Sequence, residues 1–312
     1  MPTATWYTIM ASKYSFSGHE TFPLRLNWLK KAVNAVNKKD TIFHSDEAIV
    51  EFGVGKNMVR SIRHWAISTE VIERDADSKK LNSLRVSEFG EYLLGDQGVD
   101  PYCEDVATLW LLHWLMCRSP RRSTLWHFIF GHWRGGALEL RNLRPILKRW
   151  IDEREGNVPS DATLRRDFQC FRNTYIAPRL FDSHLENIVA YPLISLGLLY
   201  ENGGMVYLRE GQSSSLPSEI FAYAVLDYWD REFFGIETIS AQDLIIKHAS
   251  PGQIFLLSEE QAFELVDRIE AFEEAPFRFD STAGVYQFYR TPGATPQSML
   301  EHYYSNGRTT VT

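Results

Sequence analysis

The chain has 312 residues and a formal net charge of −7, and 44% of its residues are hydrophobic and 13% aromatic. This composition supplies packed cores and excludes an intrinsically disordered chain, and the length suits about two or three domains. The three scattered cysteines form no CxxC pair, which excludes a disulfide framework and a cysteine zinc site. The longest apolar run, 107–117, is too short to cross a bilayer, and no signal-peptide pattern is present. We therefore expect a cytoplasmic protein that does not associate with membranes.

The charge is distributed unevenly along the chain. Residues 1–90 carry 13 Lys/Arg and 10 Asp/Glu (+3), residues 118–179 carry 13 and 6 (+7), and residues 211–312 carry 6 and 15 (−9). The front and the middle can therefore face a polyanion. The acidic last third would repel DNA phosphates, so we expect it to dock onto another protein.

The first ordered pattern is a loop that leads into a helix. Thr21 is predicted to cap a helix with Pro23 in its first turn. Gly18, His19, Glu20 and Arg25 crowd around this start, and small and titratable groups in a loop are typical of functional sites. His19, Glu20 and Arg25 are therefore candidate catalytic residues. The alternative is that they cap the helix and hold the domain together.

The stretch 45–65 has the pattern of a helix-turn-helix. A short helix ends at Gly53-Val54-Gly55, and a second helix then buries Val59, Ile62 and Ala66. The other face of the second helix carries the candidate DNA-binding residues Lys56, Asn57, Arg60 and Arg63. An ordinary corner between two helices with a solvated basic face is the alternative.

A strand pair and another helix complete this unit. Residues 70–74 and 84–86 read as antiparallel strands around a polar loop, and Ser87 caps a helix that runs to Leu94. Lys79 and Lys80 in the loop are predicted to contact DNA phosphates. Residues 14–95 are therefore predicted to form a winged-helix DNA-binding domain.

Two further units are predicted to repeat this arrangement. Residues 101–210 are basic and rich in aromatic residues, and residues 211–312 are acidic and helical with a C-terminal hairpin. In the middle unit, helices at 143–153 and 162–175 precede a hairpin at Asn202-Gly203-Gly204, and the second helix presents candidate DNA contacts at Arg165, Arg166 and Arg172. In the last unit we expect helices at 219–232, 241–248 and 259–271 and a hairpin at 277–290. The predicted fold class is α+β, mainly α with short β-hairpins, in tandem winged-helix-like domains.

No nuclease or nucleotide-binding motif accompanies these elements. Gly53-Val54-Gly55-Lys56 lacks the spacing of a phosphate-binding loop, and His127 and His132 are five residues apart, which does not put both on one helical face. Metal-dependent nucleases need converging carboxylates, and Glu20, Asp167 and Asp280 are possible contributors with no spacing that singles them out. The residues alone indicate DNA binding without a catalytic assignment.

Two stretches resemble a known bacterial family. FSGHETFPLRLNWLKKA (Phe16–Ala32) and FGVGKNMVRSIRHW (Phe52–Trp65), with the weaker SPGQIFLLSEE (Ser250–Glu260), resemble the SspB family of single-strand DNA phosphorothioation systems. The resemblance covers roughly residues 14–290. The motif positions carried over from it as candidate site residues are Gly18, His19, Glu20, Arg25, Lys56, Asn57 and Arg63.

The resemblance implies a role in bacterial defence. As the resemblance implies, a cysteine desulfurase would mobilise sulfur, an ATP-using partner would activate it, and this subunit would nick one DNA strand so that sulfur can replace a non-bridging phosphate oxygen. The implied partners are double-stranded DNA and these sulfur-transfer proteins, and a divalent metal such as magnesium is the cofactor to test for. The missing nuclease motif favours an alternative, a non-catalytic DNA-recognition adaptor. A transcriptional regulator of the same gene cluster is a third hypothesis.

Overall fold

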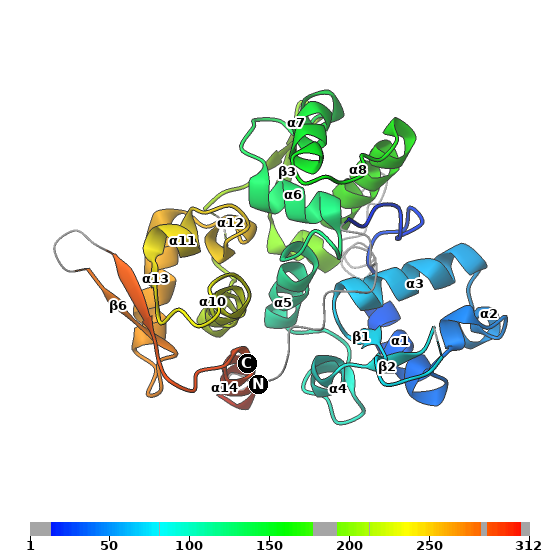
Figure 1. The fold of residues 1–312 in the computed structure, drawn as a ribbon, viewed down its shortest axis with the longest axis horizontal. Helices are drawn as coiled ribbons and strands as arrows, with labels where there is room; N and C mark the ends of the chain where they lie inside the picture. The colour runs from blue at the N-terminus through cyan, green and yellow to red at the C-terminus, as the bar shows by residue number, and fades with distance from the viewer. Residues whose placement is uncertain (1–13, 81, 177–191, 212, 282–285, 307–312) are drawn as a thin grey trace.

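The protein is described here by a computed structural model that covers residues 14–80, 82–176, 192–211, 213–281 and 286–306. Most of these residues are helical, and the strands are short antiparallel pairs, which confirms the predicted mainly helical α+β class. Figure 1 shows α5 and α10 side by side between the N-terminal helices and the hairpin that contains β6. No helix in the described parts has both the length and the apolar character needed to span a membrane.

The N-terminal unit contains the predicted helix-turn-helix and strand pair. Its elements are α1 (Leu26–Lys38), α2 (Ala48–Phe52), α3 (Lys56–Ser68), β1 (Ile72–Arg74), β2 (Leu84–Val86) and α4 (Glu88–Leu94). Gly53 ends α2 with a φ of 66°, the left-handed conformation for which glycine is suited. Ser87 caps α4 as predicted, since its hydroxyl accepts a hydrogen bond of 2.8 Å from the amide of Gly90.

The predicted start of the first helix is wrong. The helix begins at Leu26 with Arg25 as its N-cap residue, so Thr21 and Pro23 precede it. Thr21 has a φ of 74°, and Ser17 and Glu20 also have positive φ values of 60° and 46°. A β-branched residue rarely adopts such a φ, and this one cannot serve as an N-cap, which needs extended backbone. Residues 17–21 form a tight looped segment instead of a helical turn.

The middle and C-terminal units also contain most of the predicted elements. The middle unit has α5 (Val106–Cys117), α6 (Thr124–His132), α7 (Leu140–Asp152), α8 (Asp161–Tyr175), β3 (Leu199–Asn202) and β4 (Met205–Leu208). The C-terminal unit has α10 (Ser218–Glu232), β5 (Thr238–Ser240), α11 (Ala241–Ile245), α12 (Pro251–Ile254), α13 (Glu259–Glu270), β6 (Phe277–Asp280), β7 (Gln287–Arg290) and α14 (Pro296–Asn306). The expected helix 241–248 ends three residues early, and β5 joins the predicted hairpin as a third strand in the order β5-β7-β6. The turn of that hairpin, 282–285, lies outside the described residues.

A hydrophobic core connects the three units. Nearly every residue of α5 is buried, and so are the indoles of Trp110, Trp114 and Trp126 in the aromatic-rich middle unit. Helix α10 contacts α5, and the indole of Trp114 donates a hydrogen bond of 3.0 Å to Asp227 on α10. The predicted domain boundaries at residues 95–101 and 210–211 stay a prediction, and buried contacts cross the second of them.

Candidate nucleic-acid interface

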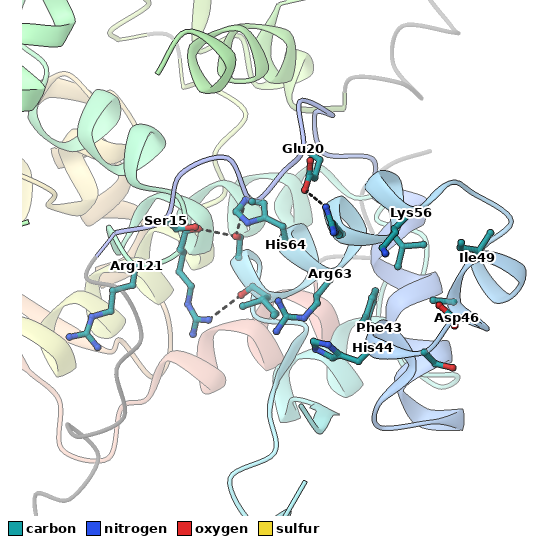
Figure 2. A pocket seen from close by; sticks show the side chains of 18 residues that line it. Ser15, Glu20, Phe43, His44, Asp46, Ile49, Lys56, Arg63, His64 and Arg121 are labelled. Atoms are coloured by element: carbon teal, nitrogen blue, oxygen red, sulfur yellow. Dashed lines mark hydrogen bonds and ion pairs between the residues drawn. The ribbon is translucent and has the colours of Figure 1, made fainter. Parts of the chain in front are cut away.

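A groove of about 700 Å³ runs along one face of α3 (Figure 2). Its described lining includes two acidic side chains, Glu20 and Asp46, together with the five cationic side chains of Lys56, Arg60, Arg63, Arg121 and Arg122. Arg121 lies at one end of the groove and Asp46 and Ile49 at the other, with Arg63 between them. An excess of positive charge in a concave surface attracts a polyanion, so this groove is the candidate nucleic-acid interface.

Helix α3 presents a continuous stripe to the groove. Lys56, Arg60, Arg63, His64 and Ile67 recur every three or four residues, so they share one helical face. The buried face carries Val59, Ile62 and Ala66, as predicted, together with Trp65, and Val59 also borders the groove. Three of the four basic or amide positions expected on this helix therefore line the groove, whereas Asn57 is exposed outside its lining.

Arg63 and His64 are the two titratable members of the stripe that are partly buried, whereas Lys56 and Arg60 are exposed. Burial lowers the pKa of the Arg63 guanidinium below its usual range, and its Nε has no hydrogen-bond partner among the described residues. Burial, with help from His19 and Arg63, lowers the pKa of His64 to about 3. His64 is therefore neutral at physiological pH, and a phosphate in the groove would supply the anionic hydrogen-bond partner that the Arg63 Nε lacks among the described residues.

Gly18 allows the loop to lie against His64. A Cβ atom at position 18 would be only 2.4 Å from Nδ1 of His64. Any larger residue would displace the imidazole, so the glycine of the first motif is fitted to the histidine of the second motif. His64 was not singled out from the sequence, although it lies four residues after Arg60 and so on the same helical face.

His19 is buried and faces away from the groove. Its side chain is 2% exposed, and its Nε2 lies 3.2 Å from Oδ1 of Asp167 on α8, although the N–H is not well aligned for a hydrogen bond. Nδ1 lies 3.1 Å from the amide of Thr21 and accepts its hydrogen, so Nε2 carries the ring proton. The amide of Ser17 also donates to both oxygens of Asp167 at 3.1 Å. Asp167 thus fixes the loop, whereas the helix itself has no side-chain cap, which the alternative for this motif had expected.

The structure does not bring the other two candidate catalytic residues together with His19. Glu20 lines the groove and lies 3.2 Å from Arg60. The guanidinium of Arg25 lies 5.1 Å from the ring centroid of Trp28 and does not line the groove. A shared reaction centre of His19, Glu20 and Arg25 is therefore not formed by this geometry.

The remaining candidate DNA-binding residues lie outside the groove lining. Lys79 is exposed in the loop between β1 and β2, and Lys80 lies 2.9 Å from Asp40. Arg165 and Arg166 are exposed on α8, whereas Arg172 lies 2.6 Å from Glu201 on β3. That these residues contact DNA stays a prediction.

The second wall of the groove comes from the turn between α5 and α6. The turn is fixed to the end of α3, because Arg122 donates to the carbonyl of Ile67 at 3.2 Å and the hydroxyl of Ser68 donates to the carbonyl of Arg122 at 3.1 Å. Arg121 and Arg122 therefore face the α3 stripe. The run Ser119-Pro120-Arg121-Arg122 is visibly basic in the sequence, but no local pattern could place it beside a helix more than 50 residues earlier.

The acidic residues do not converge on a metal. No group of three His, Cys, Asp or Glu side chains able to hold a metal ion occurs in the described parts of the chain. Asp167 is occupied with the loop, and Asp280 lies on β6 in the C-terminal unit. Only Glu20 and Asp46 supply carboxylates to the groove, so its described residues do not fit a magnesium site built from protein ligands alone.

Comparison with known proteins agrees with this fold. The family described as "Protein of unknown function (DUF4007)" matches residues 16–304. The chain belongs to this family.

Two crystal structures are similar to this chain, and both are of SspB. One, of magnesium ion-bound SspB, has a TM-score of 0.83 and 27% sequence identity and covers 95% of this chain and 89% of that chain. The other, of SspB, has a TM-score of 0.83 and 28% identity and covers 96% and 91%. The chain is thus an SspB-like protein, as the motif resemblance implied, whereas no curated protein matches it.

Proposed function

We propose that this chain is the DNA-recognition subunit of a bacterial DNA phosphorothioation system, and that it binds double-stranded DNA in the groove along α3. The observation that carries the proposal is the convergence of five cations on one groove, from α3 and from the turn between α5 and α6. A helix with its N-terminus and basic stripe facing a duplex suits backbone contacts and groove readout. The likeness to SspB supports the phosphorothioation context.

The proposed partners follow from the same context. Duplex DNA occupies the basic groove, and the sulfur-transfer and ATP-using proteins of the system dock elsewhere. The C-terminal unit is acidic, with a net charge of −9 over residues 211–312 from 6 Lys/Arg and 15 Asp/Glu, so it suits a protein partner better than DNA.

The binding proposal is tested by a salt titration of purified protein with a fluorescently labelled duplex. Each phosphate contact contributes about −0.9 to the slope of log K against log salt concentration, so about five contacts predict a slope near −4.5. A steep slope supports the groove as a phosphate-binding surface. No measurable binding of any duplex at low salt would refute the proposal.

Nicking of one strand is the second candidate function. One observation favours it, namely a carboxylate, Glu20, and a neutral imidazole, His64, in the same basic groove. Against it, an imidazole whose pKa is about 3 is a weak general base, and His19 is buried beside Asp167 and does not line the groove. The crystallised magnesium-bound relative makes a metal worth testing, but the described residues support no step through one here.

Incubation of supercoiled plasmid with the protein, with and without magnesium, separates these two functions. Open-circular product that depends on the wild-type protein and is absent with Glu20→Gln would establish nicking. Binding without any open-circular product in either condition would leave recognition as the function.

A further inference from the structure

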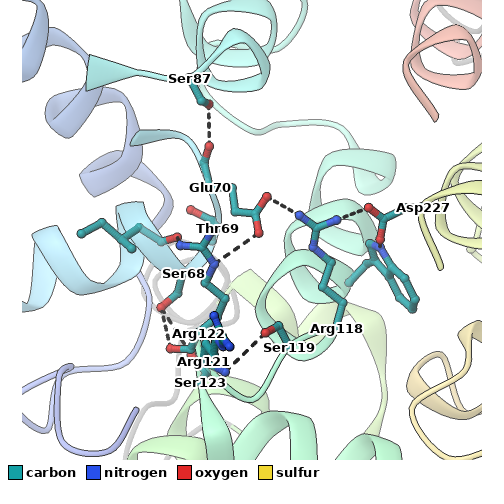
Figure 3. A network of polar contacts seen from close by, with 12 residues as sticks. Ser68, Thr69, Glu70, Ser87, Arg118, Ser119, Arg121, Arg122, Ser123 and Asp227 are labelled. Atoms are coloured by element: carbon teal, nitrogen blue, oxygen red, sulfur yellow. Dashed lines mark hydrogen bonds and ion pairs between the residues drawn. The ribbon is translucent and has the colours of Figure 1, made fainter. Parts of the chain in front are cut away.

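A buried ionic network joins the C-terminal unit to the DNA groove (Figure 3). Arg118, which follows α5, places its guanidinium between two carboxylates, that of Glu70 after α3 and that of Asp227 on α10. The three side chains are only 13%, 21% and 11% exposed, respectively. Because both carboxylates bind the same guanidinium, the position of each one depends on the other.

The groups in this network stay charged despite their burial. Burial acts to lower the pKa of Arg118, but the carboxylates of Glu70 and Asp227 raise that pKa by more than burial lowers it. The pKa of Arg118 therefore lies above its usual value. Burial likewise acts to raise the pKa of Glu70, but Arg118 and Arg122 bring it below its usual value. Asp227 is fixed in turn by the indole of Trp114 at 3.0 Å and by Nε of Arg231 at 3.3 Å.

The network ends at the second wall of the groove. The other oxygen of Glu70 lies 3.3 Å from Nε of Arg122, which lines the groove together with its neighbour Arg121. Neutralising Asp227 would leave Glu70 as the main carboxylate partner of Arg118. Glu70 would then be drawn toward Arg118 and away from Arg122, which would loosen the turn that carries both groove arginines.

We infer that Asp227 is a positioning residue for DNA binding, through which the acidic C-terminal unit holds the arginine wall of the groove in place. The inference rests on the proposed function of the groove. Asp227 lies behind the groove and does not line it, so it acts through Arg118, Glu70 and Arg122 rather than by touching DNA. The C-terminal unit therefore contributes to DNA binding even though its own charge repels DNA.

The test compares duplex affinity and its salt slope for the wild type, Asp227→Asn and Asp230→Asn. Asp230 is the matched control, since it lies on the same helix but binds Arg290 within the C-terminal unit. We expect Asp227→Asn to bind about tenfold more weakly and to have a salt slope about 1 to 2 shallower, the effect of losing one or two phosphate contacts. Asp230→Asn should bind as the wild type does.

A double-variant cycle separates positioning from a general loss of stability. In a background of Arg121→Ala and Arg122→Ala, Asp227→Asn should have no further effect on affinity or slope. Should Asp227→Asn fail to fold, judged by circular dichroism, the milder Arg231→Gln takes its place in the same cycle with a smaller loss expected.

Three results bear differently on the two proposals. A wild-type protein that binds no duplex refutes the proposed function. A wild type that binds, with an Asp227→Asn protein of unchanged affinity and slope, overturns only the positioning inference. If Asp227→Asn lowers duplex affinity as much in the background of Arg121→Ala and Arg122→Ala as in the wild type, the positioning inference is also overturned. The effect of Asp227 would then not pass through the turn that carries these two arginines.

Discussion

Individual residues explain why the two sequence motifs belong to one structure. Gly18 lies against His64, and His19 and Ser17 are held by Asp167, so the first motif is fixed between α3 and α8. These contacts join residues up to 150 positions apart along the chain. Local patterns identified the motif residues, but the division between a buried His19 and a groove-facing Glu20 depends on α8, which no local pattern could position.

The first residue-scale prediction concerns Gly18. Gly18→Ala should displace the His64 imidazole, because the new methyl carbon would be 2.4 Å from Nδ1. We expect a loss of about 1–3 kcal/mol in the free energy of unfolding, the usual range for overpacking, with weaker duplex binding. Chemical denaturation and anisotropy measure both effects. Restoration of wild-type stability by His64→Ala in the Gly18→Ala background would identify the clash as the cause, and an unaltered single variant would contradict it.

The second prediction concerns His19. His19→Ala should lower the free energy of unfolding by about 1–3 kcal/mol, because the buried Asp167 carboxylate then loses a partner. Any nicking activity of the folded fraction should persist, since the imidazole does not face the groove. Thermal melts and plasmid assays check the two parts. A variant with unchanged melting temperature and no nicking would favour the catalytic reading instead.

The third prediction concerns acid sensitivity. Burial lowers the pKa of His113 to about 4 although its hydrogen bond to Ile254 opposes this, and that of His64 is lowered to about 3. An unfolded histidine titrates near 6.5, so between pH 6.5 and about 4 the unfolded state binds more protons than the folded state. The free energy of unfolding should therefore fall as the pH drops through this window. His113→Gln should flatten the dependence measured by urea denaturation, and an unchanged slope would show that His113 does not contribute.

At the scale of elements, the helix ends show what local sequence can determine. Ser87 is a cap as predicted, and Ser160 and Ser258 occupy the same position before α8 and α13; each of the three accepts a hydrogen bond from the third residue of its helix. A cap depends on a few consecutive residues, so the pattern suffices. Thr21 fails because the contacts of Asp167 with Ser17 and His19 bend the loop, and those contacts are not local.

This contrast gives an element-scale prediction. Ser87→Ala should cost about 1 kcal/mol of unfolding free energy, as expected for a lost N-cap. Thr21→Gly should be neutral or stabilising, because glycine adopts a φ of 74° without strain. Paired denaturation curves compare the two variants. A clear loss of stability for Thr21→Gly would contradict the argument that the threonine is strained at this φ.

The whole molecule has a basic groove and, elsewhere, an acidic hollow. The groove along α3 gathers cations, whereas a second hollow of about 1040 Å³ beside α14 is lined by acidic residues that include Glu273, Glu274 and Glu301. Charge alone would predict that removing residues 211–312 spares DNA binding. Because α10 covers α5 and Asp227 holds Arg118, substitutions on the acidic surface are the better test of partner docking.

Substitutions in the acidic hollow should separate partner docking from DNA binding. Glu273→Lys with Glu274→Lys should weaken co-purification with the sulfur-transfer partner while leaving duplex affinity unchanged, since both side chains line the acidic hollow and neither lines the groove. Unimpaired co-purification would mean that the partner binds another surface.

The central claim is that the groove along α3 binds duplex DNA. The most direct measurement compares the duplex affinity of two double variants at low salt. The groove variant carries both Arg60→Ala and Arg63→Ala, and the control carries both Lys148→Ala and Arg149→Ala, which remove two exposed cations from α7. The account predicts that the groove variant loses at least about tenfold in affinity and about 2 in salt slope, while the control changes little. Equal losses in the two variants, or no loss in the groove variant, would contradict it.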